Sequence, residues 1–311
     1  MNYCFGIDVG GTTVKLGLFQ TDGTLLKKWE VKTRTEDKGA HILEDVAASI
    51  KSVMAEESIE IEQVTGAGIG VPGPTRADGY VERCVNLGWE HKNPATELGD
   101  LLGVPVKAGN DANVAALGEM WKGGGEGYLD IVLMTLGTGV GGGVVLGGKM
   151  VAGNRGLGGE LGHIVINPDE TVRCNCGNYG CVEQYASATG VVRVAKKLMA
   201  ESEKASVIRE ENPLTAKAVF DAAKAGDELA LAAVDVLGRY LGQVVAMAAL
   251  TVDPDVFVIG GGVSKAGSIL TDVVTKYYYK YTTLTEQKVP IVLAKLGNDA
   301  GIYGAARMAL S

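Results

Sequence analysis

Hydrophobic residues recur along this chain in two patterns, as short β-branched runs and as stretches with helical spacing. The short runs predict strands over residues 3–9, 13–20, 25–31, 64–71, 104–109, 255–260 and 289–293, and two strands joined by a turn over 131–146. Apolar residues three and four positions apart predict helices over 40–56, 94–102, 112–121 and 267–280, two or three over 184–252, and a last one from Gly301. The alternation of strands and helices indicates an α/β fold.

The chain also has a faint internal repeat. Two apolar runs joined by Gly10-Gly11-Thr12 open the sequence, and residues 131–146 repeat the order of apolar run, glycine-rich turn and apolar run. This repeat predicts two related lobes, each of which begins with a glycine hairpin.

Composition narrows the class of protein. With 311 residues, 46% hydrophobic and 21% charged, the chain suits a soluble protein with two domains. The net charge of −8 and the absence of a basic cluster argue against nucleic acid or a membrane as the partner. No signal-peptide pattern precedes the first strand, and five cysteines fit a reducing compartment, so we expect a cytoplasmic protein.

Three of the cysteines, Cys174, Cys176 and Cys181, follow His163 closely in the sequence. Three thiolates and an imidazole form a complete tetrahedral set for zinc and leave no position for water, which predicts a structural Zn²⁺. The alternative is a group of small buried thiols. Glu160 and Glu183 bracket the cluster, and fixed carboxylates suit a polyol because they accept hydrogen bonds from hydroxyls. These two residues could equally be solvated surface glutamates.

The two glycine hairpins are candidate phosphate loops. Glycines let backbone N–H groups approach phosphate oxygens, hydroxyls add donors, and Asp8 at a strand end could hold a hydrated Mg²⁺. The first loop would use Asp8, Gly10, Gly11, Thr12, Thr13 and Lys15, and the second Gly137, Thr138 and Gly139. The second matches G-x-G-x-x-G but continues as a strand instead of opening a helix, which disfavours a dinucleotide fold. For the first loop, a plain hairpin turn is the alternative.

The run from Glu160 to Glu183 carries a family resemblance. Glu-x-Gly-His at 160–163 and Cys-x-Cys-Gly-x-x-Gly-Cys-x-Glu at 174–183 resemble the signature of the ROK (repressor, open reading frame, kinase) family of bacterial sugar kinases and sugar-sensing repressors. The resemblance implies that His163 and the three cysteines bind zinc and that Glu160, His163 and Glu183 contact a sugar. It also implies a two-lobed actin-like ATPase (ribonuclease H-like) fold with a cleft between the lobes. We expect residues 1–116 with 298–311 in the small lobe and 117–297 in the large one.

The same resemblance suggests the remaining site residues. It implies that Asn110 and Asp111 bind the sugar, with Asp111 as the general base, although Asp111 could simply cap a helix. Gly73 and Asn86 would line the sugar pocket. Gly261 and Gly262 would form an adenosine loop, for which an ordinary turn from strand to helix is the alternative. Trp89 either stacks on the sugar or lies in the core.

The expected activity is that of a glucokinase, in which the γ-phosphate of Mg·ATP moves to the 6-hydroxyl of glucose. Other acceptors stay open, namely fructose, mannose, N-acetylmannosamine and N-acetylglucosamine, and so does polyphosphate as the donor. A non-catalytic sugar-sensing repressor is the remaining rival, disfavoured because the first strand begins at Tyr3 and leaves no room for a helix-turn-helix. We expect a homodimer or homotetramer.

Overall fold

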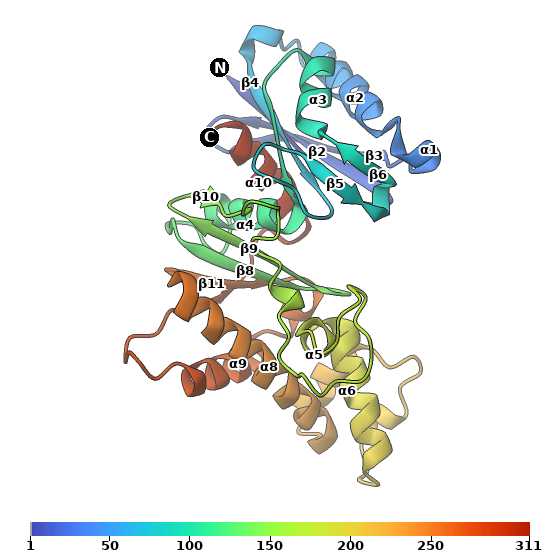
Figure 1. The fold of residues 1–311 in the computed structure, drawn as a ribbon, viewed down its shortest axis with the longest axis vertical. Coiled ribbons are helices and arrows are strands. Elements are labelled where there is room, and N and C mark those ends of the chain that lie inside the picture. The colour runs from blue at the N-terminus through green and yellow to red at the C-terminus, as the bar shows by residue number, and fades with distance from the viewer. Residues whose placement is uncertain (1) are drawn as a thin grey trace. The chain divides into compact units, whose positions relative to one another are not determined.

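The structure is a computed structural model that describes residues 2–311 (Figure 1). It contains two compact units. The first unit runs to Asp130 and also includes Gly143–Gly159 and Leu296–Ser311, whereas the second consists of Ile131–Gly142 and Glu160–Lys295. The predicted lobe boundaries, 1–116 with 298–311 and 117–297, stay a prediction.

The sheet of the first unit has five strands in the order β3-β2-β1-β4-β7. These strands are β1 (Tyr3–Val9), β2 (Thr13–Gln20), β3 (Leu25–Lys32), β4 (Val64–Val71) and β7 (Val106–Asn110). β1 pairs antiparallel with β2 and parallel with β4, and β4 pairs parallel with β7. The first glycine turn therefore joins two strands in the middle of the sheet, as the apolar pattern predicts.

Helices pack on both faces of this sheet. The helices of the unit are α1 (Glu36–Gly39), α2 (Ile42–Glu56), α3 (Pro94–Leu102), α4 (Asp111–Lys122) and α10 (Ala300–Ala309). On one face, Phe5 and Ile7 of β1 pack with Ile42 and other buried residues of α2. On the opposite face, Cys4 packs with Ile302 of α10. A Cβ on Gly6 would lie 1.9 Å from the backbone oxygen of Ile302, so glycine lets α10 lie directly on the strand.

The second sheet repeats the topology of the first, with the order β10-β9-β8-β11-β12. Its strands are β8 (Ile131–Leu136), β9 (Val140–Leu146), β10 (Lys149–Met150), β11 (Val256–Gly260) and β12 (Ile291–Leu293). β11 pairs parallel with both β8 and β12. Both sheets thus place a glycine hairpin on one side and parallel strands on the other, which confirms the internal repeat at the level of topology.

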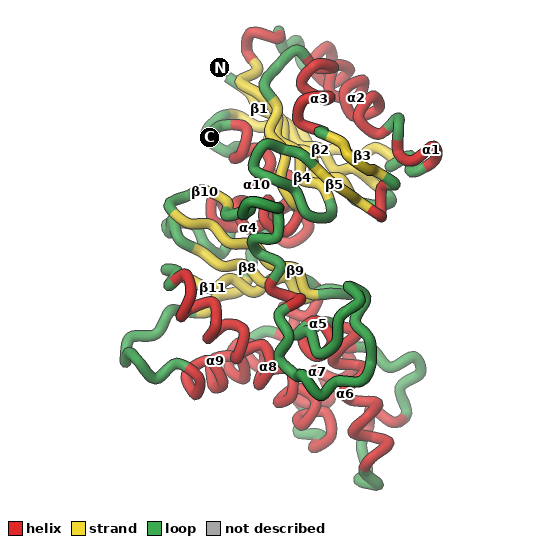
Figure 2. The backbone as a smooth tube through the Cα atoms, in the orientation of Figure 1, coloured by secondary structure: helices red, strands yellow, loops and turns green. Residues whose placement is uncertain are grey.

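Five helices belong to the second unit: α5 (Glu183–Ala186), α6 (Ala188–Glu201), α7 (Ala216–Lys224), α8 (Glu228–Val252) and α9 (Ser268–Tyr281) (Figure 2). α8 has 25 residues and is apolar enough to cross a membrane by length and composition, yet 61% of its most apolar stretch is buried. Leu237, Leu241 and Val245 of α8 are 0% exposed. It is the core helix of this unit.

Several features differ from the sequence-based expectation. The helix expected over 40–56 begins at Ile42, because α1 before it contains left-handed residues at Asp37 and Lys38. The strand expected over 104–109 begins at Val106. A small antiparallel hairpin, β5 (Val81–Cys84) and β6 (Trp89–Lys92), was not expected.

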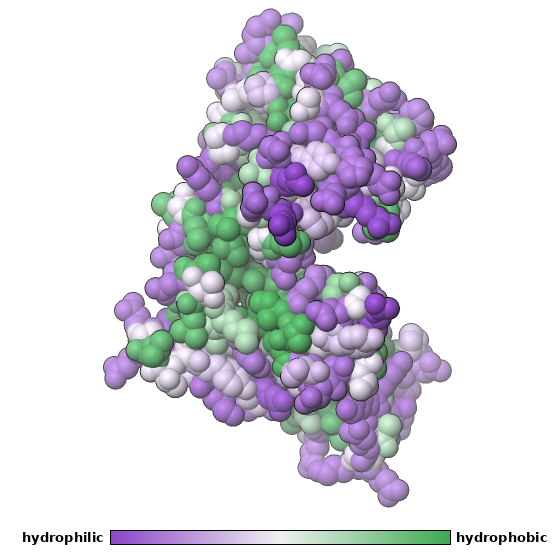
Figure 3. Space-filling view, in the orientation of Figure 1, coloured by the Kyte–Doolittle hydropathy of each residue, from purple (hydrophilic) through white to green (hydrophobic). Residues whose placement is uncertain are grey.

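Trp89, in the second strand of that hairpin, is a core residue. Its side chain is 2% exposed, and its indole Nε1 donates a hydrogen bond of 3.0 Å to the backbone oxygen of Gly39. The stacking role on a sugar is therefore wrong. The exposed side chains of α2 and α3 are mostly polar, as the space-filling view of this unit shows (Figure 3).

Candidate functional site

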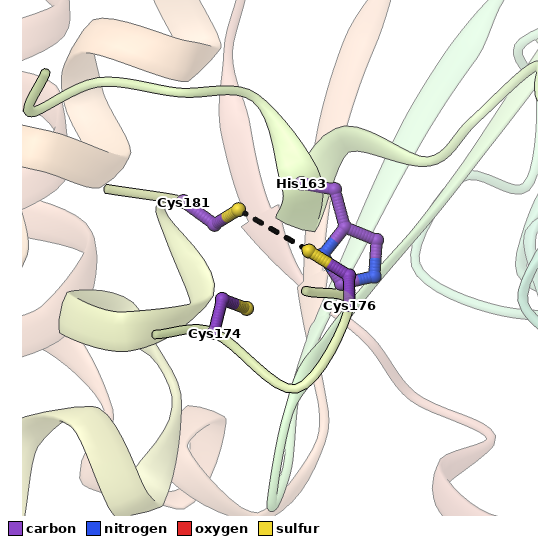
Figure 4. A group of neighbouring side chains, drawn as sticks. All are labelled: His163, Cys174, Cys176 and Cys181. Carbon is purple, nitrogen blue, oxygen red and sulfur yellow. Dashed lines mark hydrogen bonds between the residues drawn. The ribbon is translucent and has the colours of Figure 1, made fainter. Parts of the chain in front are cut away.

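The four predicted zinc ligands lie together in the second unit (Figure 4). One ligand atom from each of His163, Cys174, Cys176 and Cys181 lies within 4.8 Å of the other three. The Sγ atoms of Cys176 and Cys181 are 3.6 Å apart, too far for a disulfide. Zinc–sulfur bonds of ~2.3 Å at tetrahedral angles separate two sulfur atoms by roughly 3.7 Å, so the cluster fits a structural zinc ion.

His163 gives an independent indication of a metal. Its ring nitrogen Nδ1 is buried and has no hydrogen-bond partner among residues 2–311. Figure 4 shows one ring nitrogen of His163 facing the sulfur atoms. A buried imidazole nitrogen without a partner is costly unless it binds something, and a metal ion supplies that partner.

The thiols need a metal in order to ionise. Burial and then the neighbouring thiols of Cys176 and Cys174 raise the pKa of Cys181 to about 12. A protonated thiol is a poor ligand, whereas a bound zinc ion displaces the proton. Two turns allow this local crowding, since Gly177 and Gly180 have φ values of 94° and 73°.

Glu183 connects this cluster to the second glycine hairpin. Its Oε2 accepts a hydrogen bond of 3.0 Å from the backbone N–H of Val140, the first residue of β9. Its Oε1 lies 3.5 Å from the Sγ of Cys174. A Cβ on Gly139 would lie 2.3 Å from Oε2, so a side chain at that position would displace the carboxylate. The hydrogen bond from Val140 fixes the carboxylate at the hairpin, with the cysteine cluster beside it.

Glu160 and His163 lie at the two ends of a short 3-10 turn, η3 (Leu161–His163). His163 Nε2 is 4.0 Å from Glu160 Oε2, so the second ring nitrogen faces this carboxylate. A Cβ on Gly162 would lie 1.9 Å from the backbone oxygen of Val140, which means that η3 packs directly on β9. Both predicted sugar-binding segments of this unit therefore contact Val140.

The second phosphate-loop candidate is held in place by α6. The backbone N–H of Ala188 donates to the oxygen of Gly137 at 2.8 Å, and Thr189 Oγ1 donates to the oxygen of Thr138 at 2.7 Å. Gly261, a predicted adenosine-loop residue, has a φ of 81°, and a Cβ there would lie 2.5 Å from the oxygen of Leu136. The two glycine loops of this unit are thus neighbours at the end of β8.

In the first unit, Asp8 lies at the end of β1, before the turn Gly10–Thr12. Burial raises the pKa of the Asp8 carboxyl above its usual range, and the charge of Lys15 opposes this shift. A Cβ on Gly301 would lie 2.5 Å from the Asp8 carboxyl carbon, so the start of α10 closely approaches Asp8. A half-buried carboxylate beside an exposed glycine turn suits a hydrated magnesium ion.

Two of the predicted loop glycines have no internal reason to be glycine. Neither Gly11 nor Gly262 has a positive φ, and nothing among residues 2–311 lies within 4 Å of a Cβ built on either. Neither backbone conformation nor packing therefore excludes a side chain there. Close approach of a ligand to the backbone would explain both glycines.

The Asn110-Asp111 pair opens α4, and every polar position of the Asn110 side chain is used locally. Its Nδ2 donates to the oxygen of Gly73 and to Asp111 Oδ1, both at 3.1 Å. Its Oδ1 accepts from the backbone N–H groups of Ala112 and Asn113 at 3.0 and 3.1 Å. Asn110 is thus the helix N-cap and also fixes Gly73 and Asp111. If Asn110 bound a sugar hydroxyl, that contact would replace one of these hydrogen bonds.

The remaining sugar-pocket candidates lie in the same region. A Cβ on Gly73 would lie 4.0 Å from Cys84 Cα, and exposed Asn86 follows in the turn η2 (Val85–Leu87). Burial raises the pKa of Cys84, and the charge of Asp111 adds to that shift. The structure therefore gathers Gly73, Asn110 and Asp111 in one region of the first unit, and Asn86 is two residues from Cys84.

Sequence reasoning missed two residues that shape these regions. Val140 contributes a backbone N–H to Glu183, and Gly301 leaves room for Asp8. A backbone donor leaves no trace in the residue type. The small residues Ala300-Gly301 after Asn298-Asp299 are the only signal that a helix start approaches another element closely.

Comparison with known proteins identifies the family. The model of the ROK family matches residues 4–311. The chain belongs to the ROK family. A glucokinase of Halalkalibacterium halodurans is 40% identical over 96% of this chain and 92% of its own length. A glucokinase of Thermotoga maritima is 38% identical over 97% and 95%. The crystal structure of a ROK family glucokinase from Streptomyces griseus in complex with glucose and AMPPNP has a TM-score of 0.76 and 32% identity, and the match covers 99% of both chains.

The ROK assignment confirms the predicted fold class. ROK sugar kinases have the two-lobed actin-like ATPase fold, and the repeated sheet order of this chain is a feature of that fold.

Proposed function

We propose that this protein is an ATP-dependent glucokinase, which transfers the γ-phosphoryl group of ATP to the 6-hydroxyl of glucose. The hydrogen bond between Glu183 and the N–H of Val140 carries the proposal. It joins a residue proposed to hold the sugar to the hairpin proposed to hold the nucleotide phosphates. A kinase needs this adjacency because the acceptor oxygen must lie in line with the phosphoryl group.

Asp111 is the proposed general base. It would take the proton from the attacking hydroxyl, and its carboxylate is held by the Asn110 amide and by the Ala112 N–H at 2.8 Å. Such a base must be aimed before the substrate arrives, since misplacement of the reacting groups lowers the rate. Gly73, Asn86, Asn110, Glu160, His163 and Glu183 are proposed to bind the sugar.

The proposed ATP-binding residues lie in the glycine loops named above. Asp8, Gly10, Gly11, Thr12, Thr13 and Lys15 from the first unit, and Gly137, Thr138, Gly139, Gly261 and Gly262 from the second, are the proposed ATP-binding residues. Asp8 would hold Mg²⁺ through water, and a bound magnesium ion neutralises charge on the phosphoryl oxygens. Zinc at His163 and the three cysteines has a structural role, because no position is left for a substrate.

Two finer proposals concern the cell and the assembly. The reducing environment that keeps three thiols available for zinc favours the cytoplasm. A homodimer or homotetramer is proposed for the assembly.

A coupled assay of ADP release tests the function. We expect turnover with ATP and glucose, and slower turnover with fructose, mannose, N-acetylmannosamine and N-acetylglucosamine. Faster turnover of an N-acetylated sugar would reassign the acceptor, and turnover with polyphosphate alone would reassign the donor. Binding of glucose without any turnover would favour a sugar-sensing protein instead.

A further inference from the structure

A pocket of about 250 Å³ lies wholly within the first unit, beside β7. Its walls are the loop Thr75–Gly79, the strand Val106–Asn110, the segment Gly148–Met150 and the end of α10. β7 is the last strand of its sheet, so no other strand of residues 2–311 pairs with its outer edge. Backbone N–H groups along that edge are available to a ligand.

The pocket is basic although the chain is acidic. Four cationic side chains line it, those of Arg76, Lys107, Lys149 and Arg307, and Asp78 is its one carboxylate side chain. The Asp78 carboxylate already accepts a hydrogen bond of 3.0 Å from the N–H of Tyr80. In a protein of net charge −8, this concentration of positive charge is local and needs a reason.

Internal ion pairs do not supply that reason. Arg76 is 3.6 Å from Glu82, a long contact, and it stacks on the ring of Tyr80. Lys107 donates to the backbone oxygen of Ser311. The side chains of Lys149 and Arg307 make no hydrogen bond or ion pair among residues 2–311. Two cations therefore line the pocket with no protein acceptor.

We propose that this pocket binds a small phosphate-bearing anion, either free phosphate or a phosphate monoester. Arginine and lysine are the side chains that bind phosphate oxygens, and the free backbone edge of β7 adds neutral donors. The volume is below the range of about 300–1,000 Å³ typical of larger ligands, so a nucleotide is too big.

The pocket also contacts Asn110, which holds the proposed base, and Asn113 in the next turn of the chain. Asn110 and Asn113 both line it. Asn110 holds Gly73 and Asp111, and Asn113 donates to the oxygen of Gly158 at 2.7 Å and accepts from the N–H of Val144 at 3.2 Å. An anion bound here changes the environment of that hydrogen-bond network, and so regulates turnover. This second step rests on the proposed function, whereas the binding site does not.

Equilibrium dialysis of the full chain with radiolabelled inorganic phosphate tests the site. A saturating non-hydrolysable ATP analogue is present, so that the nucleotide loops are occupied. We expect one bound phosphate per chain, and at least tenfold weaker binding in Lys149→Glu and in Arg307→Gln. Lys51→Glu is the matched control, because Lys51 is an exposed lysine of α2 whose side chain makes no hydrogen bond or ion pair among residues 2–311. It should bind phosphate as the native chain does. Unaltered binding in both pocket variants, or no bound phosphate at all, overturns the site.

Competition and kinetics separate the remaining possibilities. If glycerol 3-phosphate displaces the label more strongly than unlabelled phosphate does, a phosphate monoester is the preferred ligand. If it displaces the label more weakly, free phosphate is the preferred ligand. In phosphate-free buffer, both variants should keep native kcat and KM, and added ligand should change turnover of the native chain alone. If the bound ligand leaves the turnover rate of the native chain unchanged, the regulatory step is wrong. Absence of any turnover would overturn the proposed kinase activity. The dialysis result alone would then decide whether the phosphate site exists.

Discussion

Asn110 uses both its amide donors and its carbonyl oxygen on neighbouring residues, and this arrangement holds Asp111. An asparagine at a helix N-cap needs only its oxygen for capping. The amide nitrogen is therefore the part of the side chain that serves the site, through Gly73 and Asp111.

The first residue-scale prediction concerns Asn110→Ser. Serine caps a helix about as well as asparagine, but it lacks the amide donors to Gly73 and Asp111. We expect a melting temperature close to native and a kcat at least tenfold lower. Asn93→Ser is the matched control, because Asn93 caps α3 through the N–H of Thr96. Equal effects of the two substitutions on kcat would contradict the positioning role.

The second residue-scale prediction concerns Asp111→Asn. Asparagine keeps an oxygen that can accept from Asn110 and Ala112 but cannot accept the proton of the sugar hydroxyl. We expect kcat to fall by about 10²–10⁴-fold with little change in the affinity for glucose. Stopped-flow binding and steady-state kinetics measure the two quantities. A kcat within threefold of native would assign the base to another residue.

At the scale of elements, the segment that carries the zinc ligands is fixed at a second point. Glu170 accepts hydrogen bonds from Tyr185, from the Arg193 guanidinium at 2.8 Å and from the N–H of Val172 at 2.9 Å. Tyr185 and Arg193 belong to α5 and α6, so this network ties the segment before the cysteines to these helices. The zinc cluster and the Glu170 network therefore restrain the same segment independently.

Zinc removal tests the first restraint. Cys176→Ser should bind less zinc than the native chain, for which about one ion per chain is expected by elemental analysis. Because the cluster fixes the segments of Glu160, His163 and Glu183, the KM for glucose should rise at least tenfold. The control is Cys4→Ala, which removes a buried thiol outside the cluster and should leave the zinc content at the native level. A zinc-free Cys176→Ser enzyme with native KM would separate the cluster from sugar binding.

Glu170→Gln tests the second restraint. Burial alone would raise the pKa of Glu170, but hydrogen bonds from Arg193, Tyr185 and Val172 outweigh it and lower the pKa to about 2. Because the pKa of Glu170 is lower in the folded chain, its ionised form stabilises the fold at pH values above the unfolded pKa of 4.5. This contribution to stability disappears as the pH falls toward the folded pKa of about 2. At most about 3 kcal/mol is at stake.

The variant should therefore unfold at lower urea than the native chain at pH 7, and the gap should narrow at pH 3. Glu203→Gln is the control, because Glu203 is exposed and its side chain makes no hydrogen bond or ion pair in the described part of the chain, residues 2–311. It should show no gap at either pH. A gap that stays constant between the two pH values would mean that the ionised carboxylate of Glu170 is not what stabilises the segment.

Local features of the site could be predicted from the sequence, and contacts between distant segments could not. The zinc ligands lie close together in the sequence, and the glycine hairpins can be recognised from their clustered glycines. The bond from Glu183 to Val140 joins residues 43 apart, and that from Asn110 to Gly73 joins residues 37 apart. Neither follows from spacing, because register and packing decide which backbone group is free. The hairpin β5–β6 was missed since its strands have only four residues each.

At the scale of the whole molecule, the chain repeats one design twice. Each sheet places a glycine hairpin beside parallel strands, and each carries one part of the proposed site on loops at the strand ends. Asp111 and the first phosphate loop belong to one unit, whereas the zinc cluster and the second loop belong to the other. A sugar that contacts residues of both units should therefore stabilise both.

Thermal unfolding with glucose tests this coupling. A ligand that binds only the folded chain adds about 2.7 kcal/mol at a hundred times its Kd, which raises the melting temperature by several degrees. Galactose, which differs at one hydroxyl, should stabilise less at equal concentration. Hydrogen exchange should slow in both α4 and η3, since the proposed contacts lie at Asp111 and at Glu160 and His163. If glucose protected only η3, then the sugar would be bound by the second unit alone, and Asp111 could not act as the base.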